Sequence, residues 1–199
     1  MAWSNIFCQI IGATGPVIGE GLLSGWQTSI ELEGFEWGIK ANSTHDPDYG
    51  FGGALKRAAK TALPIRGVDY EIETKELTLK KRFDIASSDI HLLLDLELPI
   101  LSVSITVLHI TPSGQTFHRP GFVILATDCK IKKADVQLAK AGDKGVEVKE
   151  TIVIEYEAIT ITYLRSIPGP TGREPIPMPP FVYTKPKPAP APPSIPGAP

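Results

Sequence analysis

The alternation of apolar and polar residues along the first 165 positions predicts a mainly β protein. In residues 30–39 apolar and acidic residues alternate, so Ile30 and Leu32 are expected to face inward and the glutamates outward. Gly34 interrupts this phase, which indicates a β-bulge or a close approach of another backbone segment. After the interruption Trp37 shares a face with other apolar residues, and we expect it to lie in the wall of the sheet.

Similar patterns predict the remaining strands. They lie at residues 4–11, 69–83, 101–110, 122–132, 134–140 and 146–164. In the last of these strands the apolar parity changes near Ala158, which predicts a bulge where a long strand bends around a barrel corner. Residues 142–145 contain two glycines and an aspartate, a composition typical of a turn between strands.

One helix is expected at residues 90–96, where leucines occur on almost every side. Ser87 or Ser88 is the predicted N-cap, and Pro99 ends the helix. Leucines all round a helix indicate that it is buried, here against the sheet. A second, weaker helix is predicted at residues 53–63, with a leucine and three alanines on one face.

The composition changes near Ser166, where proline-rich sequence replaces the alternating pattern. We therefore divide the chain into a domain of residues 1–165 and a tail of residues 166–199. Proline fixes φ and has no backbone N–H, so the tail is expected to be extended polyproline II rather than helix or sheet.

The 199 residues carry a formal net charge of −2, which gives no bias toward nucleic acid or anionic membranes. No apolar run approaches the roughly 20 residues that cross a bilayer as a helix. No basic residue precedes Lys40, and Gln9 interrupts the first apolar run, so no signal peptide is expected. The two cysteines, Cys8 and Cys129, lie in apolar strand patterns and are expected to be buried free thiols.

Candidate sites for chemistry are few, and each has a simpler explanation. Residues 12–19 contain the glycines of a dinucleotide-binding turn, but further glycines interrupt the helix that such a turn requires, so a loop is expected. His45, Asp46 and Asp48 could bind a metal, but the neighbouring proline and glycine predict an exposed turn. We therefore assign no catalytic, cofactor-binding or metal-binding residue.

The other histidines give no stronger signal. His109 and His118 flank a turn without an accompanying carboxylate or cysteine, and His91 falls on the predicted helix. A basic cluster accompanies several glutamates in other segments, which indicates either a mixed solvated surface or complementary contact between subunits. The cluster consists of Lys56, Arg57, Lys60 and Arg66.

Five short motifs occur in an order that is found in one known family. They are an apolar first strand at 5–10, a Gly-Glu-Gly turn at 19–21, an aromatic–Trp–Gly signature at Phe35, Trp37 and Gly38, a basic–aromatic strand end at 77–84 before a serine-led helix, and a closing strand at 150–163. In this order the chain resembles the haemolysin-coregulated protein (Hcp) family, the tube subunits of the type VI secretion system. The resemblance covers roughly residues 4–165.

This resemblance implies a fold and a function. The fold would be a compact two-sheet β-barrel flanked by one short α-helix, to which this chain adds an extended proline-rich C-terminal tail. Six copies would form a ring, and rings would stack into the hollow inner tube of a contractile apparatus that carries effectors in its lumen. Partners would be further copies of the chain, sheath, spike and baseplate proteins, and effector cargo, with no nucleic acid, cofactor or active site. The protein would assemble in the cytoplasm and be secreted without a signal peptide.

Two segments are predicted to make contacts in such a tube. Residues 41–65 correspond by position to the loop that bridges successive rings in the family. The predicted inter-ring contacts are Leu55, Lys56, Arg57, Ala58, Ala59 and Lys60. The tail is either a solvated arm or an arm docked on a partner, with Pro177, Pro179, Phe181 and Tyr183 as anchors.

Three alternatives stay open at this point. The chain could be the tail-tube protein of a phage-like particle, which has the same general architecture. It could be a stand-alone ligand-binding β-barrel, which predicts a monomer. A hydrolase or metal enzyme would use His45, Asp46 and Asp48, and would lose its activity or its metal in a His45→Ala variant.

Overall fold

The structure, a computed structural model, describes residues 6–42, 71–109, 119–140, 145–169 and 172–185. The chain forms two compact units, of which the larger comprises Met1–Phe35 with Leu77–Pro199 and the smaller Glu36–Glu76. The protein is mainly β with one short helix in its described part, as the sequence predicts.

The larger unit contains ten paired strands and the helix. Its elements are β1 (Ile6–Gly12), β2 (Gly15–Pro16), β3 (Ile30–Glu36), β6 (Leu77–Arg82), α2 (Ile85–Asp95), β7 (Ile100–His109), β8 (Arg119–Lys140), β9 (Val146–Glu155), β10 (Ala158–Gly169), β11 (Gly172–Pro177) and β12 (Phe181–Thr184). The smaller unit contains the antiparallel pair β4 (Ile39–Asn42) and β5 (Glu71–Thr74).

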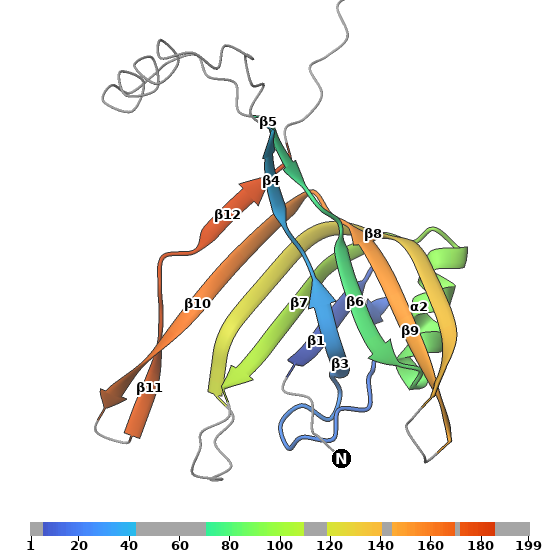
Figure 1. Ribbon diagram of the computed structural model, residues 1–199, viewed down its shortest axis with the longest axis horizontal. Coiled ribbons are helices and arrows are strands. Elements are labelled where there is room, and N and C mark those ends of the chain that lie inside the picture. The colour runs from blue at the N-terminus through green and yellow to red at the C-terminus, as the bar shows by residue number, and fades with distance from the viewer. Residues whose placement is uncertain (1–5, 43–70, 110–118, 141–144, 170–171, 186–199) are drawn as a thin grey trace, which may run out of the picture. The chain divides into compact units, whose positions relative to one another are not determined.

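Six strands close into a barrel (Figure 1). Their order is β8, β7, β1, β3, β6 and β9, and β9 pairs back onto β8. The closure depends on the length of β8, because its first half pairs with β7 up to Cys129 and its second half pairs with β9 from Lys130 onward. A register shift between Ile131 and Lys133, together with a positive φ of 52° at Asp128, marks the bend between the two halves. The two separate strands expected at residues 122–140 are therefore one bent strand.

The core lies inside this barrel and follows the predicted alternation. Ile30 and Leu32 of β3 are buried, as the sequence predicts, and both cysteines are buried and free. The other fully buried barrel residues alternate in the same way on each strand. They include Cys8, Ile10, Leu77, Leu79, Val103, Ile105, Ile124, Ala126, Ile152 and Ile154.

The expectation for Trp37 is wrong, and so is a close backbone approach at Gly34, whereas a bulge there stays a prediction. Among the described residues, no heavy atom lies within 4 Å of the position that a Cβ on Gly34 would take. β3 ends at Glu36, and Trp37 is a half-buried residue of the smaller unit rather than a residue of the barrel wall. The alternation of apolar and polar residues continues past the end of β3, into residues that belong to the smaller unit.

The helix is longer than predicted and has a different cap. α2 begins at Ile85, and the Asp84 side chain accepts a hydrogen bond from the Ala86 N–H, so Asp84 is the N-cap. Ser87 completes a capping box by accepting from the Asp84 N–H with its side chain. The sequence analysis missed Asp84 because it placed the first turn too late.

The predicted change of parity in the last long strand is confirmed. The buried residues are even-numbered up to Tyr156, and the next buried residue is Ile159. The strand is interrupted at residues 156–157 and continues as β10 without a change of register against β8. The β9–β10 segment therefore turns its other face inward at this point.

Part of the proline-rich tail is β-structure rather than free polyproline II. β10 runs through Gly169, β11 pairs with Leu164–Gly169 and β12 pairs with Ala158–Ile161. In Figure 1 β12 lies along the edge of β10 that does not face β8. The expected absence of sheet is thus wrong for these strands, because prolines are tolerated on an edge strand. The division at residue 165 stays a prediction.

Candidate functional site

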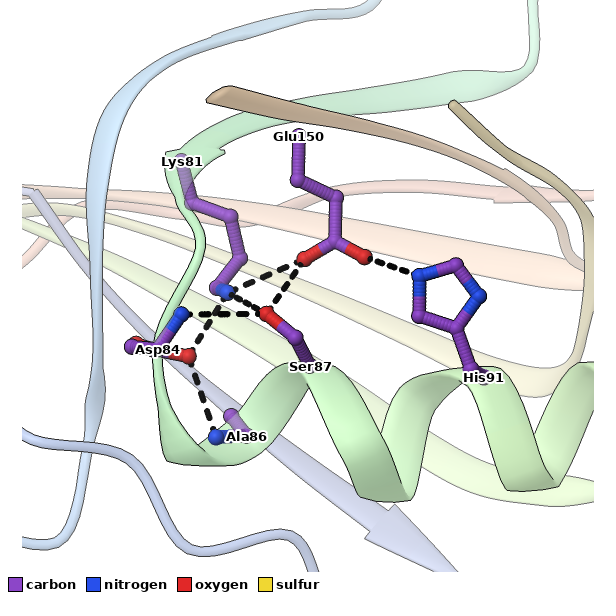
Figure 2. Close-up of polar contacts among 6 residues, drawn as sticks. All are labelled: Lys81, Asp84, Ala86, Ser87, His91 and Glu150. Carbon is purple, nitrogen blue, oxygen red and sulfur yellow. Dashed lines mark hydrogen bonds and ion pairs between the residues drawn. The ribbon is translucent and has the colours of Figure 1, made fainter. Parts of the chain in front are cut away.

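A buried polar network joins α2 to the barrel (Figure 2). The Lys81 Nζ donates hydrogen bonds to Asp84 Oδ1 at 2.7 Å, Ser87 Oγ at 2.8 Å and Glu150 Oε2 at 3.0 Å. The Ser87 hydroxyl donates to the same Glu150 oxygen at 2.8 Å. The side chains of Lys81, Ser87 and Glu150 are at most 1% exposed.

The strand pattern explains why these charged groups are inside. Lys81 continues the inward parity of Leu77 and Leu79 on β6, and Glu150 has the inward parity of the β9 core residues. Lys81 and Glu150 are direct partners in the β6–β9 register, so their side chains emerge side by side. Isolated burial of either charge would be strongly unfavourable, but here each charge is paired and hydrogen-bonded.

His91 closes the network from the helix side. Its Nε2 lies 2.8 Å from Glu150 Oε1, which is an ion-pair distance, and its ring lies 6.5 Å from that of Phe83. Neither Nε2 nor Oε1 has a hydrogen bond of good geometry with any residue that the structure describes. The His91–Glu150 contact is therefore a close approach of the ring nitrogen to the carboxylate oxygen. It joins the second half of α2 to the middle of β9.

The network has the residue types of a catalytic site but not its accessibility. A serine hydrogen-bonded to a lysine is an arrangement that some hydrolases use as nucleophile and base. Here both Ser87 and Lys81 are completely buried, so a substrate does not reach the hydroxyl. The arrangement can fix α2 to the barrel, and this structural role is the one that the geometry supports.

Among the described residues, no group of three or more His, Cys, Asp or Glu side chains is placed to hold a metal ion. His45, Asp46, Asp48 and His118 lie outside the described residues, and only the backbone of His109 is described. In the same described part of the chain, no helix is both long and apolar enough to cross a membrane.

The predicted contact residues have different outcomes. All six inter-ring residues, Leu55 to Lys60, lie outside the described residues, so the inter-ring contact stays a prediction. Phe181 and Tyr183 lie on β12, where their partners are Ile161 and Ile159 of the same chain. Pro177 ends β11, and Pro179 is exposed between the two strands. Pro177, Phe181 and Tyr183 thus pair with the chain's own strand β10, and docking of the four anchors onto a partner stays a prediction.

The outer side of α2 carries an exposed apolar stripe. Ile85, Leu92 and Leu96, which are spaced seven and four residues apart, are 54–56% exposed. Only the opposite face, with Ile90 and Leu93, is buried against the barrel. The prediction that the whole helix is buried is therefore wrong for a single chain. Contiguous exposed apolar surface is typical of regions that contact another molecule.

Glu33, one of the glutamates considered for complementary contact between subunits, makes its ion pairs within the chain. The Lys149 Nζ donates to both carboxylate oxygens of Glu33, at 2.7 and 3.0 Å, and this hydrogen bonding raises the pKa of Lys149. Arg82 contacts Glu33 and Glu147. This exposed cluster links β3, β6 and β9 and does not require a second subunit.

The functional elements that the sequence analysis missed are Lys81 and Glu150. Both continue an alternation of buried apolar residues, and this continuation was the available signal. Charged residues were read as outward-facing, so the pair across β6 and β9 was not found.

Known proteins resemble this one in their fold but not in their sequence. No protein-family description and no curated protein matches the sequence. Among solved structures, a type six secretion system protein is 17% identical, with a TM-score of 0.63 over 90% of this chain and 95% of that chain. The chain has the Hcp fold. The Hcp1 protein from the E. coli EAEC 042 pathovar is 16% identical, with a TM-score of 0.61 over 80% of this chain and 91% of its own.

The secreted protein Hcp3 from Pseudomonas aeruginosa is also similar, at 14% identity and a TM-score of 0.59, with 92% of this chain and 98% of that chain covered. The structural match thus covers nearly the whole length of this chain and of Hcp3, although few residues are identical. Coverage of about 90% also means that the match extends beyond the sequence motifs noted at residues 4–165.

Proposed function

We propose that this protein is the structural subunit of a ring of six copies, which stacks into the inner tube of a type VI secretion or related contractile injection apparatus. The observation that carries the proposal is the Hcp fold over nearly the full length of this chain and of the similar structures. The tube would carry effectors in its lumen and be secreted without a signal peptide. Its other partners would be sheath, spike and baseplate proteins.

The packing of the barrel supports a role in assembly over a role as a ligand carrier. The barrel has six strands, and buried side chains such as Ile10, Ile105 and Ile124 occupy its interior. Small barrels of this kind are filled by side chains rather than ligands. Function is therefore expected on the outer surface, where the α2 stripe is exposed.

Ring formation can be tested by size-exclusion chromatography with light scattering. Six copies of 21.5 kDa correspond to about 129 kDa. Salt is expected to weaken assembly without abolishing it, because screening affects the ion pairs and not the apolar burial. A protein that stays at the mass of one chain at low salt and high concentration would contradict the proposal and favour the stand-alone barrel.

Stacking is proposed to use residues 41–65 as the bridge between rings. The triple variant Lys56→Glu, Arg57→Glu, Lys60→Glu is expected to form rings that do not stack, because the charge of the contact segment is reversed. Lys133→Glu is the control, since this exposed lysine lies on β8, outside residues 41–65. Electron micrographs in which the triple variant still forms long tubes would contradict this role of the segment.

A further inference from the structure

The outer edge of β10 is covered by one continuous segment, residues 172–185, which we name the strap. Its first part is β11, which pairs with β10 from Gly169↔Gly172 to Leu164↔Pro177. Its second part is β12, which pairs from Ile161↔Phe181 to Ala158↔Thr184. The strap therefore runs antiparallel to β10 along its whole length.

The backbone hydrogen bonds show which way each part of the strap faces. The Met178 N–H donates to the Tyr163 carbonyl at 2.8 Å, and the Lys185 N–H donates to the Glu157 carbonyl at 2.8 Å. Because N–H groups alternate between the two edges of a strand, the even-numbered N–H groups of β11 and the odd-numbered ones of β12 face β10. The nitrogens of Pro175 and Pro177 consequently face away from β10.

The prolines thus remove no hydrogen bond from the sheet, and they leave the middle of the new edge, residues 175–180, without outward donors. The register changes by one residue between β11 and β12, so Pro179 and Pro180 both lie opposite Thr162. This is the arrangement of a β-bulge, and neither bulged residue has an N–H to satisfy. From Pro175 to Pro180 no N–H points outward, so another strand has no donor to pair with there.

The end of the strap is anchored by a lysine. Lys185 Nζ donates to Glu155 Oε1 at 3.0 Å and lies 5.6 Å from the centroid of the Tyr156 ring. The hydrogen bond to Lys185 lowers the pKa of the Glu155 carboxyl. Together with the backbone bond to Glu157, these contacts hold the strap at the junction of β9 and β10.

We propose that the strap is an edge-closing element, which occupies the free edge of β10 and prevents the sheet from pairing with a strand of another molecule. Without it, one edge of the twelve-residue strand β10 would be unpaired, including the edge at Ile159, Ile161 and Tyr163. The inference is independent of the proposed ring and goes beyond it. It assigns the proline-rich composition a function in solubility, and it requires contacts between copies to use surfaces other than this edge.

Amide hydrogen exchange at single-residue resolution in the full chain tests whether the strap is closed. Met178, Tyr183 and Lys185 are expected to exchange at least about tenfold more slowly than Val182 and Thr184, because only the first group donates to β10. Uniformly fast exchange over these five residues would overturn the proposal. Lys185→Gln is expected to speed exchange at Tyr183 and Lys185, whereas the control Lys187→Gln leaves it unchanged.

The blocking function is tested by restoring outward donors. The double variant Pro175→Thr, Pro177→Thr keeps the bonds to β10 and adds two outward N–H groups on a β-prone strand. It is expected to shift the mass distribution toward larger species and to bind thioflavin T, in contrast to the control Pro99→Thr, which lies outside the sheet. A mass distribution and dye response identical to those of the parent would overturn the proposal.

These experiments distinguish a failure of the strap proposal from a failure of the ring proposal. If the parent protein stays a single chain but the double variant associates through its edge, the strap is supported and the ring is not. If the parent forms rings and the double variant forms only the same rings, the ring is supported and the strap is refuted.

Discussion

The rings of Phe7 and Trp26 stack with centroids 5.0 Å apart and planes inclined by 26°. Phe7 has the outward parity of β1, since Cys8 and Ile10 face the barrel core, yet its side chain is 1% exposed. The loop that carries Trp26 therefore buries the outer face of β1. This second, smaller apolar layer lies outside the barrel.

We expect Gly21→Ala to destabilise this loop. A Cβ on Gly21 would lie 2.1 Å from the Trp26 carbonyl oxygen, which is a backbone atom and cannot move aside without disturbing the loop. The expected loss in the free energy of unfolding is about 2–4 kcal/mol by denaturant titration. Gly34→Ala is the matched control, because nothing lies within 4 Å of its Cβ position, and it should change stability by less than about 1 kcal/mol. Equal effects at both positions would contradict the close approach.

Removing one charge of the buried network should be costly. Glu150→Gln removes the fully buried carboxylate beside Lys81 and leaves the partly exposed Asp84 as its partner, and we expect a loss of about 3–5 kcal/mol in the free energy of unfolding. The double variant Lys81→Met, Glu150→Leu should lose less than the sum of the single variants, because neither charge of the fully buried pair remains. The control Lys149→Gln removes exposed ion pairs with Glu33 and Glu147, and a much smaller loss of stability is expected because water screens them. A Glu150→Gln variant as stable as this control would show that the pair is not needed.

The thiols should make stability fall at high pH. Burial is the main cause that raises the pKa of Cys8 and of Cys129 to about 12, from an ordinary value of 9.0. Above pH 9 the unfolded thiols lose their protons while the folded ones keep them, so the unfolded state is favoured as pH rises toward 12. Each thiol contributes at most about 1.4 kcal/mol per pH unit to this loss. Urea titrations at several pH values measure how steeply the free energy of unfolding falls with pH. A Cys8→Ala, Cys129→Ala variant should show a less steep fall.

The two aromatic residues Phe7 and Trp37 should respond differently to truncation. Phe7→Ala removes a fully buried side chain and is expected to cost about 3–5 kcal/mol. Trp37→Ala is expected to cost only about 1–2 kcal/mol, because Trp37 is half-buried in the smaller unit. Thermal melts of both variants decide this, and a larger loss for Trp37 would place it in a core after all.

Much of the barrel could be predicted because period-two alternation reports burial directly. Ile30, Leu32 and the change of parity after Tyr156 were all readable in this way. The same rule failed at Lys81 and Glu150, because a charged residue at an inward position is assigned to the surface unless its partner is known. That partner lies 69 residues away in the sequence, at a distance that no local pattern reports.

The strap could not be predicted from composition for a different reason. Proline content describes how many N–H groups are missing, whereas strand pairing depends on which edge the missing groups would face. Pro175 and Pro177 occupy positions where β10 needs no donor, and this follows only from the register. The cap at Asp84 was missed for a local reason, since Ser87 and Ser88 are also good N-cap residues and a cap there places the first turn too late.

The bent strand β8 also sets an order for folding. Its second half and β9 are joined by a short connection, so this hairpin can form early and locally. Closing the barrel instead requires β1 to meet β7, where Ile6 pairs with Val107 across a separation of 101 positions, the difference between 107 and 6. The entropy lost in closing so long a loop must be offset before the pairing stabilises anything. We therefore expect the β1–β7 seam to be the last part of the barrel to acquire protection during refolding.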